Sequence, residues 1–308
     1  MKNKEDICHL CMIPMTGLGL HGGYRGDTWF KYRIELFKNY TLQSLLNQTN
    51  RNFTIWLSFR PEERDNPICQ EFERYMRTVN QPSVFTYGGL MFYDDKFEDT
   101  GLLDRLKVGL PELKEKLEEA KYVYETLTPS DDLYHQSAID DIQNTEYNKG
   151  KATVFNKGFM HNTKTQRVAE WNPETNPPFY TIMYPADVFF DPVKHFEYMK
   201  DFKSHEDIAR LFECVRLPND RYCVLTHEKN ISTNYYHPFR GKEYQNGQEI
   251  MRDFGVEIGK PSKLTDTKVA FIKKAKYYGL KFLIITKLYG LSKKAKNSFE
   301  RRFNNKDR

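Results

Sequence analysis

The sequence predicts an α/β fold in which a mostly parallel central sheet is flanked by helices. Short apolar runs bounded by turn residues alternate with longer segments whose apolar residues recur every three or four positions. Such an alternation of strands and helices is typical of a parallel sheet. The chain has 308 residues, of which 15% are aromatic. A chain of this size and apolar content can bury a large core, which excludes general disorder.

In the first third of the chain, the pattern predicts three strands separated by helices. Residues 28–48 carry apolar side chains at helical spacing, and Asp27 or Thr28 is placed to cap that helix. Residues 53–59 alternate between apolar and more polar positions, which is typical of a strand. In chain order we expect a strand at 7–15, a glycine-rich loop at 17–26, the helix at 28–48, the strand at 53–59, a helix at 69–78 and a strand at 83–87.

The next part of the chain continues the same alternation. Residues 102–120 are rich in Leu, Lys and Glu, and they predict an exposed helix that Pro111 interrupts. Residues 171–178 hold three prolines and two asparagines, which predicts a loop. We further expect strands at 122–127, 151–156, 179–184 and 222–226, and helices from 138 onward, at 191–201 and at 206–214.

The formal net charge of +5 is divided unevenly along the chain. Residues 260–308 hold 15 Lys or Arg and three acidic residues, a net charge of +12, which leaves −7 for residues 1–259. We therefore expect a folded domain at 1–259 and a basic amphipathic tail at 260–308. The tail mixes lysines with aromatic and aliphatic residues, which suits an anionic membrane surface, although a helix packed on the domain explains the pattern equally well.

Compartment and partners are constrained by what the sequence lacks. No secretory leader follows Met1, and no apolar run reaches the roughly 18 residues of a membrane span. The five cysteines are scattered and odd in number, which argues against a disulfide framework. No nucleic-acid motif is present. We expect a cytoplasmic protein, peripheral at the inner face of the cell membrane if the tail binds lipid, with no nucleic-acid partner.

The glycine-rich loop contains Gly17-x-Gly19-x-x-Gly22 between a strand and a helix, which is the spacing of a dinucleotide-binding turn. In that fingerprint the third glycine lies in the first turn of the helix, whereas in this chain the helical pattern begins about six residues later. The acidic residue expected after the second strand is also missing. A plain flexible loop remains open, and so does a loop that lets a nucleotide approach the sheet, with Arg25 or Arg33 near its phosphates.

Ser130-Asp131-Asp132 directly follows the strand predicted at 122–127. Two adjacent carboxylates are costly to place together unless a positive group joins them, and a divalent cation with a diphosphate would do so. Asp131 and Asp132 are therefore candidate ligands of Mg²⁺ or Mn²⁺. The alternative is an ordinary turn, because Pro129-Ser130-Asp131 is good turn chemistry.

Two later segments also carry candidate groups. His227 follows the strand predicted at 222–226, where it could bind a metal or a phosphate or could be an ordinary hydrogen-bonded loop histidine. Glu206 and Asp207 begin a predicted helix, and either could act as a general base. Ser204 and Asp207 also fit a helix-capping pattern, which is the stronger interpretation of that segment.

Three segments taken in order resemble a known family. The first reads Trp29-Phe30-x-x-Arg33-x-x-Leu36-Phe37-x-x-Tyr40-Thr41-Leu42-x-Ser44-Leu45-x-x-Gln48-Thr49, then Phe53-x-Ile55-Trp56-Leu57. The second is Thr126-Leu127-Thr128-Pro129-Ser130-Asp131-Asp132, and the third is His227-x-x-Asn230-Ile231-Ser232-Thr233. Over about residues 7–240 they resemble a rhamnosyltransferase family of the glycosyltransferase-A fold, which also contains the family-2-like glycosyltransferases.

The resemblance implies a glycosyltransferase-A-like α/β sandwich that transfers a sugar, with rhamnose as the candidate, from a nucleotide-sugar donor to a glycan or lipid-linked acceptor. It implies a divalent cation, Mn²⁺ or Mg²⁺, held by Asp131 and Asp132, with His227 in the family's later motif. Inverting transfer would need a base, for which Glu206 or Asp207 is the candidate. The chain departs from the family at Pro129, where the metal motif has its first Asp.

Two other functions stay open on the sequence alone. The chain could be a non-catalytic membrane-surface or interaction protein that kept the fold and lost the metal motif at Pro129. The hypothesis that the chain is a nucleotide-binding oxidoreductase rests on the glycine-rich loop alone.

Overall fold

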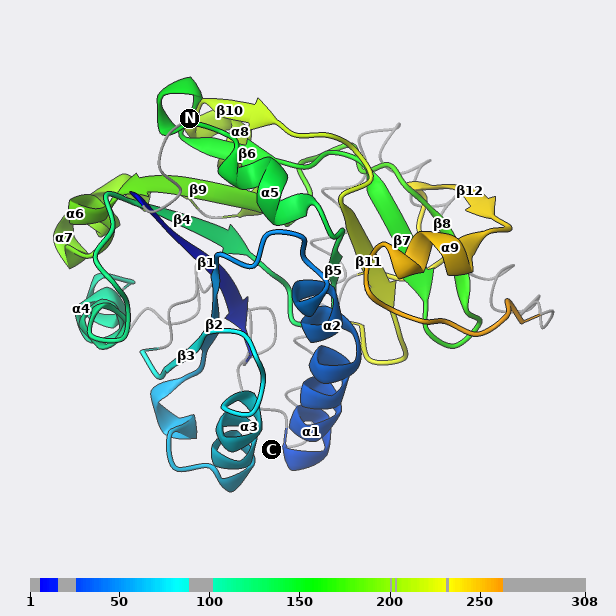
Figure 1. Ribbon diagram of the computed structural model, residues 1–308, viewed down its shortest axis with the longest axis horizontal. Coiled ribbons are helices and arrows are strands. Elements are labelled where there is room, and N and C mark those ends of the chain that lie inside the picture. Colours follow the sequence, from blue (N-terminus) through cyan, green and yellow to red (C-terminus); the bar gives the residue numbers. More distant parts are fainter. Residues whose placement is uncertain are drawn as a thin grey trace, which may run out of the picture.

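The computed structural model describes residues 6–15, 26–88, 102–199, 201–202, 204–230 and 233–262. These residues form two sheets with helices packed around them (Figure 1). The glycine-rich loop up to residue 25 and nearly all of the basic tail, from residue 263 on, lie outside the described residues. The division into a domain at 1–259 and a tail therefore stays a prediction. In the part that is described, no helix is long and apolar enough to cross a membrane.

The central sheet has seven strands in the order β10-β6-β9-β4-β1-β2-β3. Strand β9 runs antiparallel to its neighbours β4 and β6, and the remaining neighbouring pairs are parallel. The prediction of a mostly parallel central sheet is confirmed. The strands are β1 (Ile7–Pro14), β2 (Thr54–Ser58), β3 (Ser83–Thr86), β4 (Tyr122–Leu127), β6 (Ala152–Val154), β9 (Tyr180–Pro185) and β10 (Cys214–Arg216).

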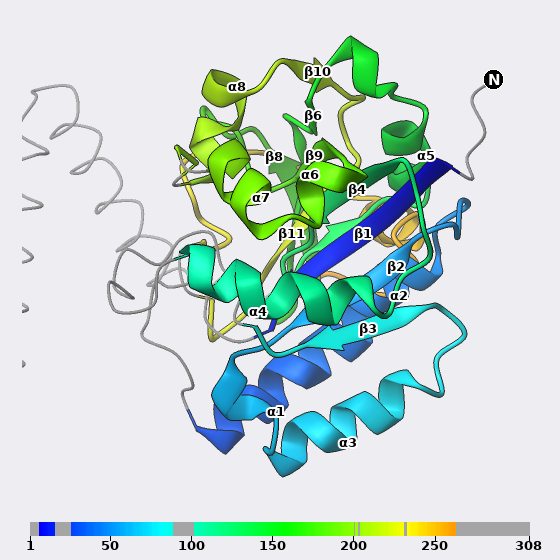
Figure 2. The ribbon, with the colours of Figure 1, turned by 90° about the vertical axis from the view of Figure 1, so that its left-hand side faces the viewer.

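Helices cover both faces of this sheet (Figure 2). Successive strand residues point to opposite faces, so Cys11 and Ile13 of β1 join one core cluster while Leu10 and Met12 join the other. The first face packs α1 (Asp27–Leu36), α2 (Leu42–Leu46), α3 (Pro67–Met76) and α5 (Ala138–Gln143). The second packs α4 (Leu102–Lys114), α6 (Ala186–Phe189), α7 (Pro192–Met199) and α8 (Ile208–Leu211).

A second sheet of five strands has the order β12-β8-β7-β11-β5. One of its faces joins the core around α1 and α2, through Met160 and Val224 among others. Its other face packs Phe159 and Cys223 against α9 (Gly247–Arg252) and the residues after it. The strands are β5 (Leu133–Tyr134), β7 (Gly158–Asn162), β8 (Arg167–Trp171), β11 (Tyr222–Thr226) and β12 (Arg240–Tyr244).

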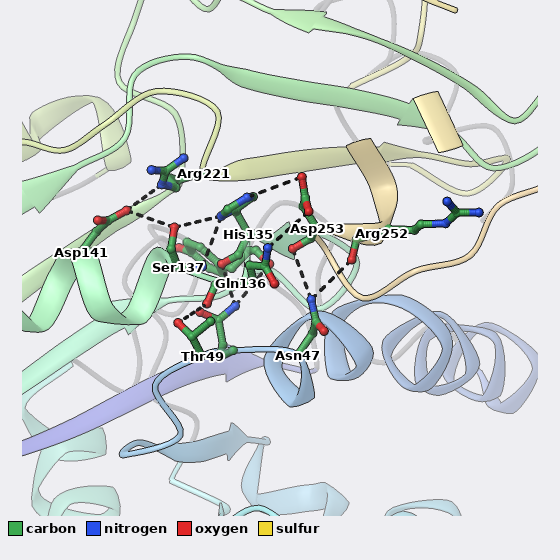
Figure 3. A network of polar contacts seen from close by, with 11 residues as sticks. Asn47, Thr49, His135, Gln136, Ser137, Asp141, Arg221, Arg252 and Asp253 are labelled. Carbon is green, nitrogen blue, oxygen red and sulfur yellow. Dashed lines mark hydrogen bonds and ion pairs between the residues drawn. The ribbon is translucent and has the colours of Figure 1, made fainter. Parts of the chain in front are cut away.

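A network of polar contacts holds the two sheets together at the chain's passage from β5 to α5 (Figure 3). The Asn47 side chain, after α2, donates to the carbonyl of Asp253 at 3.3 Å, and the backbone N–H of Gln136 donates to the same carbonyl at 2.9 Å. Arg221 donates to Asp141 at 2.6 Å. The network therefore links α2, α5 and the end of α9 around β5.

Most predicted elements are confirmed, and β4 and β11 have the predicted bounds. The long helix predicted at 28–48 is α1 and α2 joined by a π-helical turn (Phe37–Thr41). The helix predicted at 206–214 is wrong in its second half, because α8 ends at Leu211 and Cys214 begins β10. Helix α4 passes through Pro111 and ends at Lys114.

Candidate functional site

The site lies where the chain leaves the central sheet for the second sheet. From β1 the chain builds β2 and β3 on one side, and β4 lies on the other side of β1. In open α/β sheets, ligands bind outside the carboxyl ends of the strands at such a reversal of strand order. Residues 128–132 connect the carboxyl end of β4 to β5, and so they lie at this point.

Asp131 is held by a two-pronged contact with Arg33 of α1. Arg33 Nη1 donates to Asp131 Oδ2 at 2.6 Å, and Nη2 donates to Oδ1 at 2.9 Å. Arg33 Nε also donates to the hydroxyl of Ser130 at 2.8 Å. Both charged residues are only 8% exposed. Paired hydrogen bonds of this geometry are among the strongest that side chains form.

His227 closes the cluster from the second sheet. Its Nε2 lies 2.9 Å from Asp131 Oδ2, and its Nδ1 accepts the backbone N–H of Lys229 at 3.3 Å. Because Nδ1 accepts, the ring proton is assigned to Nε2, which donates to Asp131. The ring of Tyr32 from α1 packs edge-on against His227, with centroids 5.7 Å apart, and the Lys229 ammonium lies 4.4 Å from the centre of that same Tyr32 ring.

Asn230 explains the spacing of the His227-x-x-Asn230 motif. Its side-chain oxygen accepts the backbone N–H of His227, and its amide donates to the carbonyl of Leu225 at 3.0 Å. One asparagine side chain thus closes the turn after β11. That turn places His227 over Asp131.

Asp132 is bound differently from Asp131, although both are 8% exposed. Its Oδ1 accepts the backbone N–H of Leu225 in β11 at 2.9 Å. Burial and the neighbouring Asp131 charge raise the pKa of Asp132 well above its ordinary value, although the Leu225 N–H opposes this shift. Burial also raises the pKa of Asp131, but Arg33 and His227 outweigh it and bring that pKa down to about 2. The two adjacent carboxylates therefore favour opposite charge states.

The arrangement can be tested as a metal site from its donor atoms. Oδ2 of Asp131 already accepts two hydrogen bonds and Oδ1 accepts one, all from Arg33 and His227. Both ring nitrogens of His227 are engaged. Over the described ranges, no group of three His, Cys, Asp or Glu residues is arranged to hold a metal ion. Asp132 Oδ1 likewise accepts the backbone N–H of Leu225. With these donors engaged, the set as arranged does not fit a divalent cation, and we derive no step through one.

The structure brings some of the predicted site residues together and leaves others apart. Arg33, Asp131, Asp132 and His227 are brought together, whereas Arg25 lies outside the described residues. The turn predicted at Pro129-Ser130-Asp131 is present, since the backbone N–H of Asp132 donates to the carbonyl of Pro129 at 3.3 Å, and Arg33 and His227 enclose Asp131 within it.

Ser204 and Asp207 form the helix cap that the sequence favoured. Asp207 accepts the backbone N–H of Ser204 at 3.1 Å and pairs with Arg210 at 2.8 Å, while Glu206 is exposed. No contact described in this part of the chain joins either carboxylate to the Asp131 cluster. Their role as a base stays a prediction.

Three contributions to the cluster were missed from sequence. Ser130 accepts a hydrogen bond from Arg33, Tyr32 packs against the His227 ring, and Lys229 lies over the Tyr32 ring. Little in their local patterns distinguishes them from ordinary turn and helix residues. Tyr32 lies one residue before Arg33, which is the one signal that could have pointed to it.

Strand β4 also contains a buried carboxylate that no sequence motif marks. Glu125 is 3% exposed, and the hydroxyl of Tyr184 on β9 donates to its Oε2 at 3.2 Å. Among the described residues its Oε1 has no hydrogen-bond partner. Burial raises the pKa of Glu125 to about 8, although the Tyr184 hydrogen bond opposes the shift.

Comparisons with known proteins find distant structural likeness alone. No protein-family model matches the chain, and no curated protein matches it. Among solved structures, the inositol-1-phosphate CTP transferase from T. maritima is 10% identical, with a TM-score of 0.39, over 82% of this chain and 99% of that one. S. aureus TarS 1–349 is 14% identical, with a TM-score of 0.37, over 80% of this chain and 70% of that one. TarS in complex with UDP is 12% identical, with a TM-score of 0.34, over 80% and 64%. Likeness at this level does not bear on activity.

Proposed function

We propose that the chain is a glycosyltransferase that binds a nucleotide-sugar donor at the carboxyl ends of β1 and β4. The observation that carries the proposal is the buried Arg33–Asp131–His227 cluster at the reversal of strand order. Its three residues come from the three segments whose order resembles a glycosyltransferase family. A charged cluster at this point of an α/β sheet is placed to meet a charged ligand.

The proposed reaction has a simple balance of bonds. An acceptor hydroxyl oxygen bonds to the anomeric carbon of the donor sugar, and the bond from that carbon to the diphosphate oxygen breaks. The electron pair leaves with the nucleoside diphosphate, and a base takes the hydroxyl proton. The site must therefore stabilise the charge that develops on the diphosphate.

Glu206 is the better of the two candidate bases, because Asp207 is engaged in the helix cap and with Arg210. Rhamnose as the sugar, inversion at the anomeric carbon and a glycan or lipid-linked acceptor also belong to this proposal, and they rest on the family resemblance. Attachment of the basic tail to an anionic membrane at the cytoplasmic face also belongs to the proposal, and it rests on the net charge of +12 of residues 260–308.

A panel of nucleotide sugars and free nucleoside diphosphates tests the proposal. A ligand that binds the native state raises the unfolding midpoint, so a donor should shift the midpoint more than nucleotides of the wrong class. Each donor that binds is then incubated with the protein, and release of nucleoside diphosphate is measured. Binding with no release, with every acceptor tried, would favour a non-catalytic protein that keeps the site. No shift with any nucleotide would overturn the proposal.

A further inference from the structure

Asp131, one of the two carboxylates expected to bind a divalent cation, is already paired with a cation from within the chain. Arg33 reaches both oxygens of Asp131, at 2.6 and 2.9 Å, and a third donor anchors it to Ser130. A metal ion at Asp131 would have to displace this buried guanidinium. Displacing it would leave a buried charge without its partner, which is strongly unfavourable.

Two further observations point the same way. His227 donates Nε2–H to Asp131 and receives a backbone N–H at Nδ1, so neither ring nitrogen offers a lone pair to a metal. Pro129 stands where the motif it resembles has its first Asp, and proline has no side-chain ligand. The hydrogen bonds of Asp131 and His227 are a separate argument against a metal ion, because they do not depend on the proline at position 129.

Lys229 is a second cation near Asp131, and unlike Arg33 it lies at the surface. Lys229 is exposed, follows His227 closely and lies over the ring of Tyr32, at 4.4 Å from its centre. In the described part of the chain no carboxylate forms an ion pair with it. Lys164 at the same edge is also exposed, but it pairs with Glu228 at 3.3 Å. Lys229 therefore offers a positive charge beside the cluster that an incoming anion can use.

We propose that this site binds the diphosphate of its nucleotide without a divalent cation, using the positive charge of Lys229, with Asp131 as the anchor for Arg33 and His227. The inference deepens the proposed function and rests on it. Asp131 is then a positioning residue and not a metal ligand. The chemical class of ligand is a nucleoside diphosphate, either free or carrying a sugar.

Calorimetric titration of the full chain with UDP, GDP and TDP, each in EDTA and in Mn²⁺, tests the inference. Free Mn²⁺ binds the diphosphate in solution and lowers its charge, so a site that uses protein cations alone should bind nucleotide in EDTA at least as tightly as in Mn²⁺. Titration with Mn²⁺ alone should show no binding at the site. Nucleotide binding that requires Mn²⁺ would overturn this inference and leave the proposed function standing. Absence of nucleotide binding in both buffers would overturn the proposed function itself.

Two matched variants test the role of Lys229. Lys229→Met should weaken nucleotide binding about tenfold, the size of one charge-assisted contact, while Lys164→Met should change it by less than about twofold. Both side chains are exposed, so neither variant should prevent folding. Equal Kd values for the two variants would overturn the assignment of Lys229.

Discussion

Glu125 lies in strand β4 and Asp131 lies in the turn that follows it. Both carboxylates are buried, yet their surroundings favour the neutral form of Glu125 and the ionised form of Asp131. Asp131 receives a guanidinium and an imidazole N–H, and its pKa falls to about 2. Glu125 receives one tyrosine hydroxyl, and burial raises its pKa to about 8. Burial alone therefore favours the neutral acid, and a charged partner reverses this preference.

The largest expected effect comes from removing the Asp131 charge. Asp131→Asn leaves Arg33 buried without a carboxylate, so we expect a loss of about 3 to 5 kcal/mol in the free energy of unfolding. Urea denaturation measures this loss. Asp104→Asn is a suitable control, because Asp104 pairs with Lys107 at the surface, 3.4 Å away, and such pairs contribute about 0 to 1 kcal/mol. Equal losses for the two variants would mean that Asp131 stabilises the fold no more than a surface carboxylate does.

The sequence predicted one part of this cluster and missed another. Asp131 and Asp132 follow an apolar strand, and His227 follows another, so their positions at strand ends could be derived from pattern alone. The pairing of Arg33 with Asp131 could not, because 98 residues separate the two and neither has a local signal for the other. The strand order, set by packing of the whole sheet, brings them together.

The strands differ in the same way: some could be predicted from their own residues, and others depend on residues far away in the sequence. Strand β4 is Tyr-Val-Tyr-Glu-Thr-Leu, in which all residues but Glu125 and Thr126 are apolar or aromatic, and both of its ends were predicted correctly. Strand β12 (Arg240–Tyr244) is Arg-Gly-Lys-Glu-Tyr, without alternation of apolar residues, and none of its residues is fully buried. It is a strand because β8 offers it hydrogen bonds, and this pairing cannot be seen in five polar residues.

The next largest effect is a pH dependence that originates at Glu125. An unfolded glutamate is ionised above about pH 6, whereas Glu125 in the folded chain keeps its proton until the pH approaches its raised pKa of about 8. Its contribution is present at low pH and is lost as pH rises through about 8. Between pH 6 and pH 8 this group alone should cost about 2 kcal/mol of stability.

Glu125→Gln should remove that slope, because glutamine does not titrate. Asp132, whose pKa is also raised, contributes a similar slope to both chains, so the measurement is the difference between parent and variant. From pH 6 to pH 8 the difference in unfolding free energy between variant and parent should grow by about 2 kcal/mol in favour of the variant. Parallel curves across this range would show that Glu125 is ionised in the folded chain at pH 6.

The smallest expected effect comes from an ion pair that resembles the Arg33 pair in chemistry but not in burial. Arg221 donates to Asp141 at 2.6 Å in the polar network around β5 (Figure 3), and the two side chains are 26% and 24% exposed. The hydroxyl of Ser137 also donates to Asp141, at 3.4 Å. Asp141→Asn leaves Arg221 with access to water, so we expect a loss of about 1 kcal/mol in the free energy of unfolding.

Salt dependence separates this pair from the buried one. Salt screens partly exposed charges more than buried ones, and at about 1 M the screening length is only about 3 Å. The loss from Asp141→Asn should therefore shrink when unfolding is measured in high salt, whereas the loss from Asp131→Asn should stay nearly constant. If salt reduced both losses equally, Arg33 and Asp131 would be as well hydrated as the surface pair, and the contrast between the two ion pairs would not hold.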